Sequence, residues 1–146
     1  MLFWQLTIDC REPERLAAFW AEALGWSGVP PAGPETWWAL YRYRLGDEDA
    51  YDDRLFDPAG LRPPLWFQQV PEEKVGKNRL HLDLYVTGRD ASLPYAERMA
   101  LVEQKVTDLV ALGARVLMPA HGEDLPGDPT YFVVLQDPEG NEFCVS

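Results

Sequence analysis

Hydrophobic and polar residues alternate strictly in the middle of the chain, beginning at Leu80. Apolar residues occupy one set of alternate positions and polar residues the other: Leu80, Leu82, Leu84 and Val86 against His81, Asp83 and Tyr85. This period of two predicts a strand that is apolar on one face only. The polar face is either solvated or lines a cavity, and periodicity alone does not decide between these two possibilities.

A second half-polar strand is predicted near the N-terminus, over residues 3–10, where Gln5, Thr7 and Asp9 alternate with apolar residues. A helix is predicted to follow over residues 13–24, because Pro13 suits a first helical position and Gly25 suits a C-terminal stop. Its apolar residues recur at helical spacing. They are Leu16, Phe19, Trp20, Ala23 and Leu24.

The remaining elements are predicted from spacing and propensity. A longer helix is expected over about 93–112, with Gly113 as its stop, and apolar residues at Met99, Val102, Val106, Leu109 and Val110. Strands are expected over 36–43, 64–70, 114–118, 130–136 and 141–146. The segment 119–129 is expected to be a loop, and so is the acidic segment 46–53. A calcium site is the alternative for those carboxylates, but the glycine and the terminal glutamate of the usual calcium-binding loop are missing.

The chain contains an internal repeat. Leu24-Gly25 and Asp57-Pro-Ala-Gly60 in the first half match Leu112-Gly113 and Asp137-Pro-Glu-Gly140 in the second. Each half is predicted to be a β-α-β-β-β unit, the first over about 1–72 and the second over about 78–146, within one domain spanning 1–146. The fold class is therefore α+β, with curled mixed sheets around a shared cavity and helices outside.

Composition narrows the classes of partner. The 146 residues are 47% hydrophobic and 25% charged, which is typical of a folded protein. A formal net charge of -11 argues against nucleic acid or an anionic membrane as a partner. Cys10 and Cys144 lie in predicted strands, and neither a leader sequence nor a long apolar span is evident. We expect free thiols and a cytoplasmic location.

Four motifs occur in a specific order: Thr7-Ile-Asp-Cys10, Phe19-Trp20 before Leu24-Gly25, Lys77-Asn-Arg-Leu-His-Leu-Asp83, and Asp137-Pro-Glu-Gly-Asn-Glu-Phe-Cys144. In this order and spacing the chain resembles the vicinal oxygen chelate superfamily, which includes glyoxalase I, extradiol dioxygenases and bleomycin-resistance proteins. It is most similar to the glyoxalase-like proteins of unassigned substrate in that superfamily. The resemblance covers nearly the whole chain.

Metal enzymes of this superfamily take ligands from the first and last strands of each unit. The resemblance places Gln5, Gln68, His81 and Cys144 at those positions, with Cys144 where the family has a glutamate. Amides are poor ligands and cysteine binds only as the thiolate, so we predict no complete metal site and no cofactor. A divalent metal is the alternative, with charge supplied by Asp83 or Glu142 and a ligand set of Gln5, His81 and Glu142.

His81 and Asp83 are the best catalytic candidates, although a network that merely satisfies His81 is the structural alternative. The predicted ligand-binding residues are Gln5, Trp66, Gln68, His81, Asp83, Tyr85 and Cys144. The basic residues Lys74, Lys77 and Arg79 form either a solvated loop or an anion clamp.

The first functional hypothesis is a small-molecule-binding protein of the glyoxalase and bleomycin-resistance type that holds a flat or cationic organic ligand around His81. The alternative is a metal-dependent lyase, isomerase or dioxygenase of the same superfamily. A purely structural module is disfavoured, because enclosing polar strand faces without a use is costly. A homodimer is expected, since such units leave sheet edges and apolar helix surface to bury.

Overall fold

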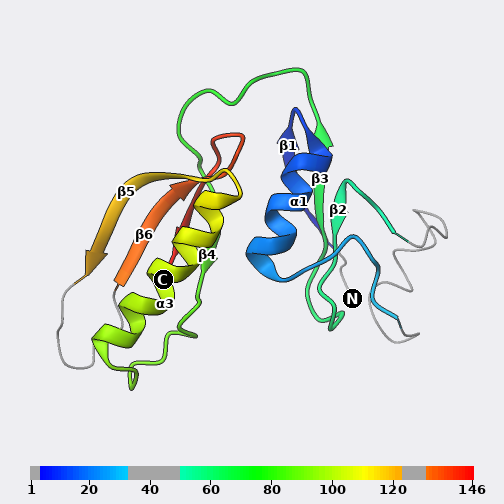
Figure 1. Cartoon of the computed structure of the whole chain (residues 1–146). Helices are drawn as coiled ribbons and strands as arrows, with labels where there is room; N and C mark the ends of the chain where they lie inside the picture. Colours follow the sequence, from blue (N-terminus) through cyan, green and yellow to red (C-terminus); the bar gives the residue numbers. More distant parts are fainter. Residues whose placement is uncertain (1–3, 33–49, 123–130) are drawn as a thin grey trace. The chain divides into compact units, whose positions relative to one another are not determined.

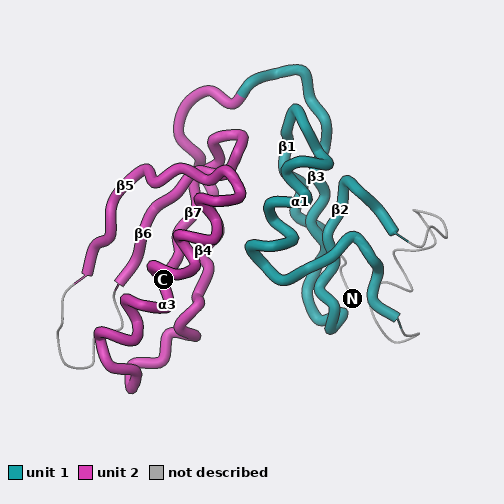
Figure 2. The backbone as a smooth tube through the Cα atoms, viewed as in Figure 1, with its two compact units in different colours: residues 1–73 teal, residues 74–146 magenta. Residues whose placement is uncertain are grey.

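The computed structural model describes residues 4–32, 50–122 and 131–146. The chain forms two compact units, Met1–Glu73 and Lys74–Ser146 (Figure 2). The strand predicted over 36–43, with its aromatic residues Trp37, Trp38 and Tyr41, lies outside the described residues, as does the first half of the acidic loop. The architecture is mixed α+β, as predicted, with one small mixed sheet in each unit.

The first unit contains β1 (Leu6–Cys10), α1 (Pro13–Leu24), β2 (Arg54–Leu55) and β3 (Leu65–Gln69). The sheet order is β1-β3-β2, in which β1 runs parallel to β3 and β2 runs antiparallel to it. Thr7 and Asp9 stand opposite Trp66 and Gln68 in the register. The polar face predicted for β1 therefore lies on the same side of the sheet as Trp66 and Gln68.

The helix α1 has the bounds predicted from the sequence. Pro13 lies in its first turn, Glu14 lies at the positive end of the helix dipole, and Gly25 ends the helix at a φ of 68°. Its apolar stripe packs against β2 and β3. The buried residues of the stripe are Leu16, Ala17, Phe19, Trp20 and Ala23.

The second unit contains β4 (Asp83–Leu84), α3 (Tyr95–Ala111), β5 (Arg115–Gly122), β6 (Tyr131–Gln136) and β7 (Glu142–Val145). The sheet order is β4-β7-β6-β5, with β4 parallel to β7 and the other neighbours antiparallel. The helix α3 packs against β6 and β7, and the turn at its end places Gly113 at a φ of 106° (Figure 1). Val102 and Leu109 are buried, whereas Val110, predicted on the same stripe, is exposed.

Two predicted elements differ in extent. The strand expected from Leu80 to Val86 is reduced to β4, and Leu80 is 79% exposed rather than buried. Lys77 and Asn78 bond to Glu142 just before this point, so the chain approaches the sheet along its edge, and within the described part of the second unit Leu80 is not covered. The prediction of a loop over 119–129 is also wrong for its first four residues, because β5 continues to Gly122 through two register shifts. Such irregularities allow Pro119 to sit in an edge strand.

The two Asp-Pro-x-Gly turns are built alike. The carboxylates of Asp57 and Asp137 are buried and accept backbone N–H bonds from Ala59 and Leu61 in one turn and from Glu139 and Asn141 in the other. Gly60 and Gly140 close these turns at positive φ. The repeated sequence thus reflects a repeated hydrogen-bonding pattern, in which each carboxylate satisfies amides that the turn would otherwise bury.

Candidate functional site

The parallel pairing of β4 with β7 sets the position of the site. Asp83 lies opposite Cys144, and Leu84 lies opposite Val145. The amides of Cys144 and Ser146 donate to Leu82 and Leu84, each at 2.9 Å. Leu84 and Val145 are buried in the core, so the neighbouring polar side chains emerge together on the opposite face.

His81, Asp83 and Tyr85 form a chain of polar contacts on this face. His81 Nε2 lies 3.4 Å from Asp83 Oδ1, and the hydroxyl of Tyr85 donates to Asp83 Oδ2 at 3.4 Å. The side chains of His81 and Asp83 are 50% and 42% exposed. They are therefore accessible to a ligand, and the predicted grouping of these three residues on one face is present within the second unit.

Cys144 completes the group at the next strand. Burial, followed by the negative charge of Asp83 and a hydrogen bond to it, raises the pKa of the Cys144 thiol. The thiol is therefore protonated at neutral pH and serves as a donor to Asp83. It does not act there as a free nucleophile.

Glu142, the other carboxylate considered from the sequence, is engaged elsewhere. Its side chain is 12% exposed and accepts a bond from Lys77 Nζ at 2.8 Å. That bond is the largest cause of a lowered pKa, and the charges of Lys74 and His81 add to it. Lys77 thus acts as a counter-ion for Glu142, and Glu142 stays ionised.

The group of His81, Asp83 and Cys144 is compatible in geometry with one divalent ion. One ligand atom from each residue lies within 4.8 Å of the others. Two ligand atoms on one tetrahedral zinc ion are about 3.4 Å apart, which matches the distance from His81 to Asp83. A bound ion would have to displace the proton of Cys144. These three residues would hold the ion within the second unit. The set of Gln5, His81 and Glu142 inferred from the resemblance stays a prediction.

Beside this group the second unit has a hollow of about 280 Å³, here called the second-unit hollow. From β4 and the turn after it come Asp83, Tyr85, Thr87 and Arg89. From β6, β7 and the C-terminal residue come Tyr131, Phe132, Cys144 and Ser146. Burial and a hydrogen bond to Glu103 raise the pKa of Tyr131 to about 12, so this phenol contributes no charge to the wall.

The predicted residues of the first unit lie on a separate part of the chain. Gln5 Nε2 donates to Thr7 Oγ1 at 3.3 Å, and Trp66 Nε1 donates to Asp53 at 3.0 Å. Trp66 and Gln68 line a hollow of about 700 Å³ in this unit. Convergence of Gln5 and Gln68 with His81 and Cys144 on one cavity remains a prediction.

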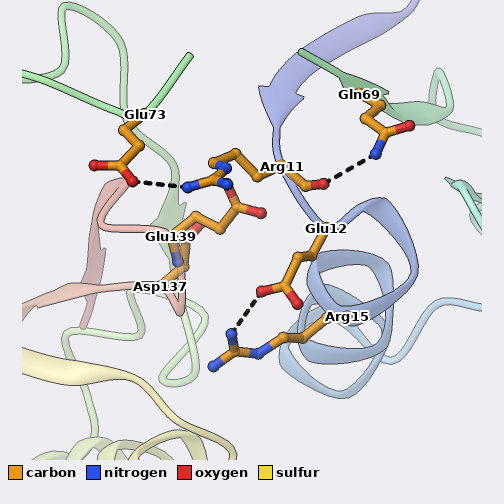
Figure 3. Close-up of polar contacts among 7 residues, drawn as sticks. All are labelled: Arg11, Glu12, Arg15, Gln69, Glu73, Asp137 and Glu139. Carbon is orange, nitrogen blue, oxygen red and sulfur yellow. Dashed lines mark hydrogen bonds and ion pairs between the residues drawn. The ribbon is translucent and has the colours of Figure 1, made fainter. Parts of the chain in front are cut away.

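Ion pairs and hydrogen bonds border the hollow of the first unit. Arg11 pairs with Glu73 at 2.7 Å, and Gln69 Nε2 donates to the carbonyl of Arg11 at 3.3 Å (Figure 3). Arg15 pairs with Glu12 at 2.8 Å one turn into α1 (Figure 3). These pairs are solvent-exposed, and exposed pairs contribute little stability.

Several residues of the second-unit hollow were missed from the sequence. Ser146 could have been found, because it continues the alternation of Glu142 and Cys144 along the last strand. Phe132 lies on β6, where almost every residue is apolar, so the sequence did not show which face of the strand borders a hollow. Arg89 was not singled out, because a single charged residue after a glycine is a common feature of loops.

Comparison with known proteins gives the class of the fold. Over residues 5–146 the chain matches a family model described as glyoxalase-like domain. A search of curated proteins finds no significant match. Among the described residues, no helix is both long and apolar enough to cross a membrane.

Solved structures share the fold at low identity. One is a glyoxalase/bleomycin resistance protein/dioxygenase family enzyme from Burkholderia phytofirmans PsJN, with a TM-score of 0.59 and 16% identity over 97% of this chain and 94% of that one. The fosfomycin resistance protein FosX from Mesorhizobium loti has a TM-score of 0.56 and 11% identity over 99% and 92%. A FosX mutant from Listeria monocytogenes, solved with Mn(II) and 1S,2S-dihydroxypropylphosphonic acid, has a TM-score of 0.56 and 12% identity over 99% and 90%.

The protein is thus an α+β protein of the vicinal oxygen chelate type, as its motifs predicted. It belongs to the glyoxalase-like domain family.

Proposed function

We propose that this protein binds a small organic molecule in the second-unit hollow, without a resident metal ion, and that the ligand has a flat part and a cationic group. The observation that carries the proposal is the position of Asp83. Its carboxylate lines the hollow, is partly exposed, and accepts a bond from the hydroxyl of Tyr85. A cationic group can therefore bind to it from the hollow.

Aromatic side chains support the flat part of the ligand. Tyr85 and Phe132 lie in the same wall as Asp83, and aromatic faces bind flat or cationic groups. The net charge of -11 favours the approach of a cation. His81, 3.4 Å from Asp83, is placed to hold or exchange a proton with the bound group.

A metal-dependent enzyme is the second candidate, favoured by the geometry of His81, Asp83 and Cys144. FosX from Listeria monocytogenes, which shares the fold, was solved with Mn(II). A bound ion would supply Lewis-acid chemistry. Asp83 would be its carboxylate ligand and His81 its imidazole ligand, so the cationic group of the first proposal would have no free carboxylate to bind.

The first proposal is tested with benzylamine and its neutral analogue benzyl alcohol, titrated into the full chain and followed by amide NMR signals. Benzylamine is expected to shift the signals of the second-unit hollow at about millimolar affinity, typical of so small a ligand. Benzyl alcohol is expected to bind more weakly, because it lacks the charge that Asp83 recognises. Asp83→Asn is expected to remove the difference between the two probes.

Asp108→Asn is the matched control, because Asp108 is an exposed carboxylate on α3 of the same unit, outside the hollow. This variant should retain the preference for benzylamine. Equal binding of both probes to the unmodified chain, or a preference that survives Asp83→Asn, would contradict the proposal.

A further inference from the structure

We propose that the second-unit hollow also contains an anion subsite centred on Arg89, so that its ligand carries a carboxylate-type group in addition to the cationic group held by Asp83. This inference rests on the proposed function, and it names the chemical class of the ligand as a flat organic zwitterion. Arg89 is the only arginine in the wall of this hollow among the described residues.

The backbone at Arg89 is the first observation. Arg89 has a φ of 56°, the only positive φ at a non-glycine residue in the described part of the chain. It follows Gly88, which has a φ of 59°, and the amide of Asp90 donates to the carbonyl of Thr87 at 3.1 Å. Positive φ at both central positions of such a turn favours glycine or asparagine. An arginine here costs stability, and residues held at such a cost are concentrated at functional sites.

The turn is held in place by its neighbours. The amide of Arg89 donates to the hydroxyl of Thr87, which is buried, at 3.3 Å. Asp90 accepts bonds from the amide and hydroxyl of Ser92 at 2.8 and 2.6 Å. The guanidinium of Arg98, a residue only 3% exposed, donates to the carbonyl of Leu93 at 3.0 Å. Hydrogen bonds therefore hold the turn that bears Arg89, and such ordering before binding lowers the cost of binding a ligand there.

The side chain of Arg89 is the second observation. Its guanidinium lies over the ring of Tyr85, 5.1 Å from the centroid. Within the described residues no carboxylate lies within ion-pair distance of it, so its donors are available to a ligand. Stacking on an aromatic face leaves the in-plane N–H groups of a guanidinium free to bind a carboxylate.

Tyr85 links the two charges of the hollow. The guanidinium of Arg89 lies over the ring of Tyr85, and the hydroxyl of Tyr85 donates to Asp83. The lining thus has a positive end at Arg89 and a negative end at Asp83, with an aromatic ring between them. Asp83 would attract the cationic group of a ligand and Arg89 its anionic group, so a ligand that carries both charges matches the lining best.

The experiment compares para-aminomethylbenzoate with para-aminomethylbenzamide, which share the ring and the amine and differ only in the anion. Both are titrated into the full chain at physiological salt, where long-range charge is screened within about 8 Å. The benzoate is expected to bind at least about tenfold more tightly, as a charge-assisted bond to Arg89 would give. Arg89→Gly is expected to reduce this ratio to about one.

Two controls separate binding from folding. Glycine adopts the φ of residue 89 freely, so Arg89→Gly should melt at the same temperature as the unmodified chain or higher. Arg115→Gln removes an exposed arginine of β5, outside the hollow, and should keep the ratio. A ratio near one in the unmodified chain, or a ratio that survives Arg89→Gly, would overturn the inference, as would failure of both probes to shift signals of the hollow.

Asp83→Asn distinguishes this inference from the function on which it rests. This variant is expected to weaken the binding of both probes by the same factor, so the ratio of their affinities should not change. If Asp83→Asn does not weaken the binding of either probe while Arg89→Gly still reduces the ratio of affinities to about one, the proposed role of Asp83 is wrong and the Arg89 subsite stands. If only Asp83→Asn has an effect, the cation-binding function stands and the anion subsite is rejected.

Discussion

Asp83 and Cys144 face each other across the parallel pair of β4 and β7. Asp83 is a carboxylate two residues after His81, and Cys144 is a thiol at a position where the resemblance predicts a glutamate. Burial is the largest cause of the raised pKa of the Cys144 thiol, the charge of Asp83 and the hydrogen bond to it raise the pKa further, and the thiol gives Asp83 a hydrogen-bond donor. This strand pair therefore carries a neutral thiol and one carboxylate at a place where two carboxylates would repel each other.

The first prediction concerns the reactivity of Cys144. Burial raises the thiol pKa most, and Asp83 raises it further by its charge and its hydrogen bond, so less thiolate is present at any given pH near neutrality. Asp83→Asn should lower this pKa and accelerate alkylation of Cys144 by iodoacetamide at pH 8 severalfold. Mass spectrometry of the peptide that contains Cys144 measures the rate.

Cys10 provides an internal reference in the same sample, because it is a buried cysteine of the first unit whose thiol donates to the carbonyl of Gln68. Its slow alkylation should not change with Asp83→Asn. Slower alkylation of Cys144 in the variant, or equal acceleration of both cysteines, would argue against the proposed effect of Asp83.

The second prediction concerns the buried carboxylate of Asp137, which is 1% exposed. It accepts the amides of Glu139 and Asn141 and the side-chain amide of Asn141. Asp137→Ala would leave these donors without an acceptor and should lower the free energy of unfolding by roughly 2–4 kcal/mol. Chemical denaturation followed by circular dichroism measures the change.

Asp137→Asn should cost less, because its amide oxygen can still accept the two backbone bonds. Asp57→Ala should resemble Asp137→Ala, since the two turns have the same pattern. Asp108→Ala, an exposed position on α3, should stay within about 0.5 kcal/mol of the unmodified chain. Equal stability of Asp137→Ala and Asp108→Ala would show that the buried carboxylate is not needed by the turn.

The third prediction concerns metal content. Protein purified without added metal should hold well under one equivalent of divalent ion. Binding at His81, Asp83 and Cys144 must remove a proton from a thiol whose pKa is raised, and Lys77 already pairs with Glu142. Added zinc should bind more tightly as pH rises, because the thiol loses its proton more readily. Elemental analysis and a zinc titration measure both quantities.

The two histidines of the chain provide the control. His81→Ala should weaken the binding of added zinc, and His121→Ala should not. About one equivalent of zinc, nickel or iron in the purified protein, lost in His81→Ala and kept in His121→Ala, would contradict the prediction. The metal-dependent enzyme would then become the first functional hypothesis.

The fourth prediction is a homodimer. β5 is the edge strand of its sheet, and no described strand pairs with its outer edge. Val116, Leu117 and Met118 on this strand are exposed apolar residues. An unpaired apolar edge can pair with its own copy about a two-fold axis. Light scattering at micromolar concentration should give twice the mass of one chain.

Leu117→Lys should shift the protein toward the monomer, because it places a charge on the edge that pairs. Leu61→Lys alters an exposed leucine of the first unit and should leave the dimer intact. A monomer mass for the unmodified chain would contradict the prediction of a homodimer. A dimer that persists in Leu117→Lys would show that the interface does not lie at the edge of β5.

The sequence by itself determined the local elements and their repetition. The helix from Pro13 to Leu24 could be bounded to the residue, because a proline at its start and a glycine at its end depend only on local backbone geometry. The Asp-Pro-x-Gly turns were found for the same reason. His81, Asp83 and Tyr85 could be grouped because strand alternation fixes which side chains of one strand share a face. The resemblance added Cys144 to this group.

Tertiary structure alone decided how far the strands extend and which side chains meet. Leu80 fits the alternation perfectly and is nevertheless exposed, since a core exists beneath a strand only where other elements cover it. The contact of Asp83 with Cys144 depends on the register of two strands that are about 60 residues apart, which local pattern does not encode. Arg89 became a candidate only through its φ and the ring beneath it, because neither backbone strain nor stacking can be read from residue order.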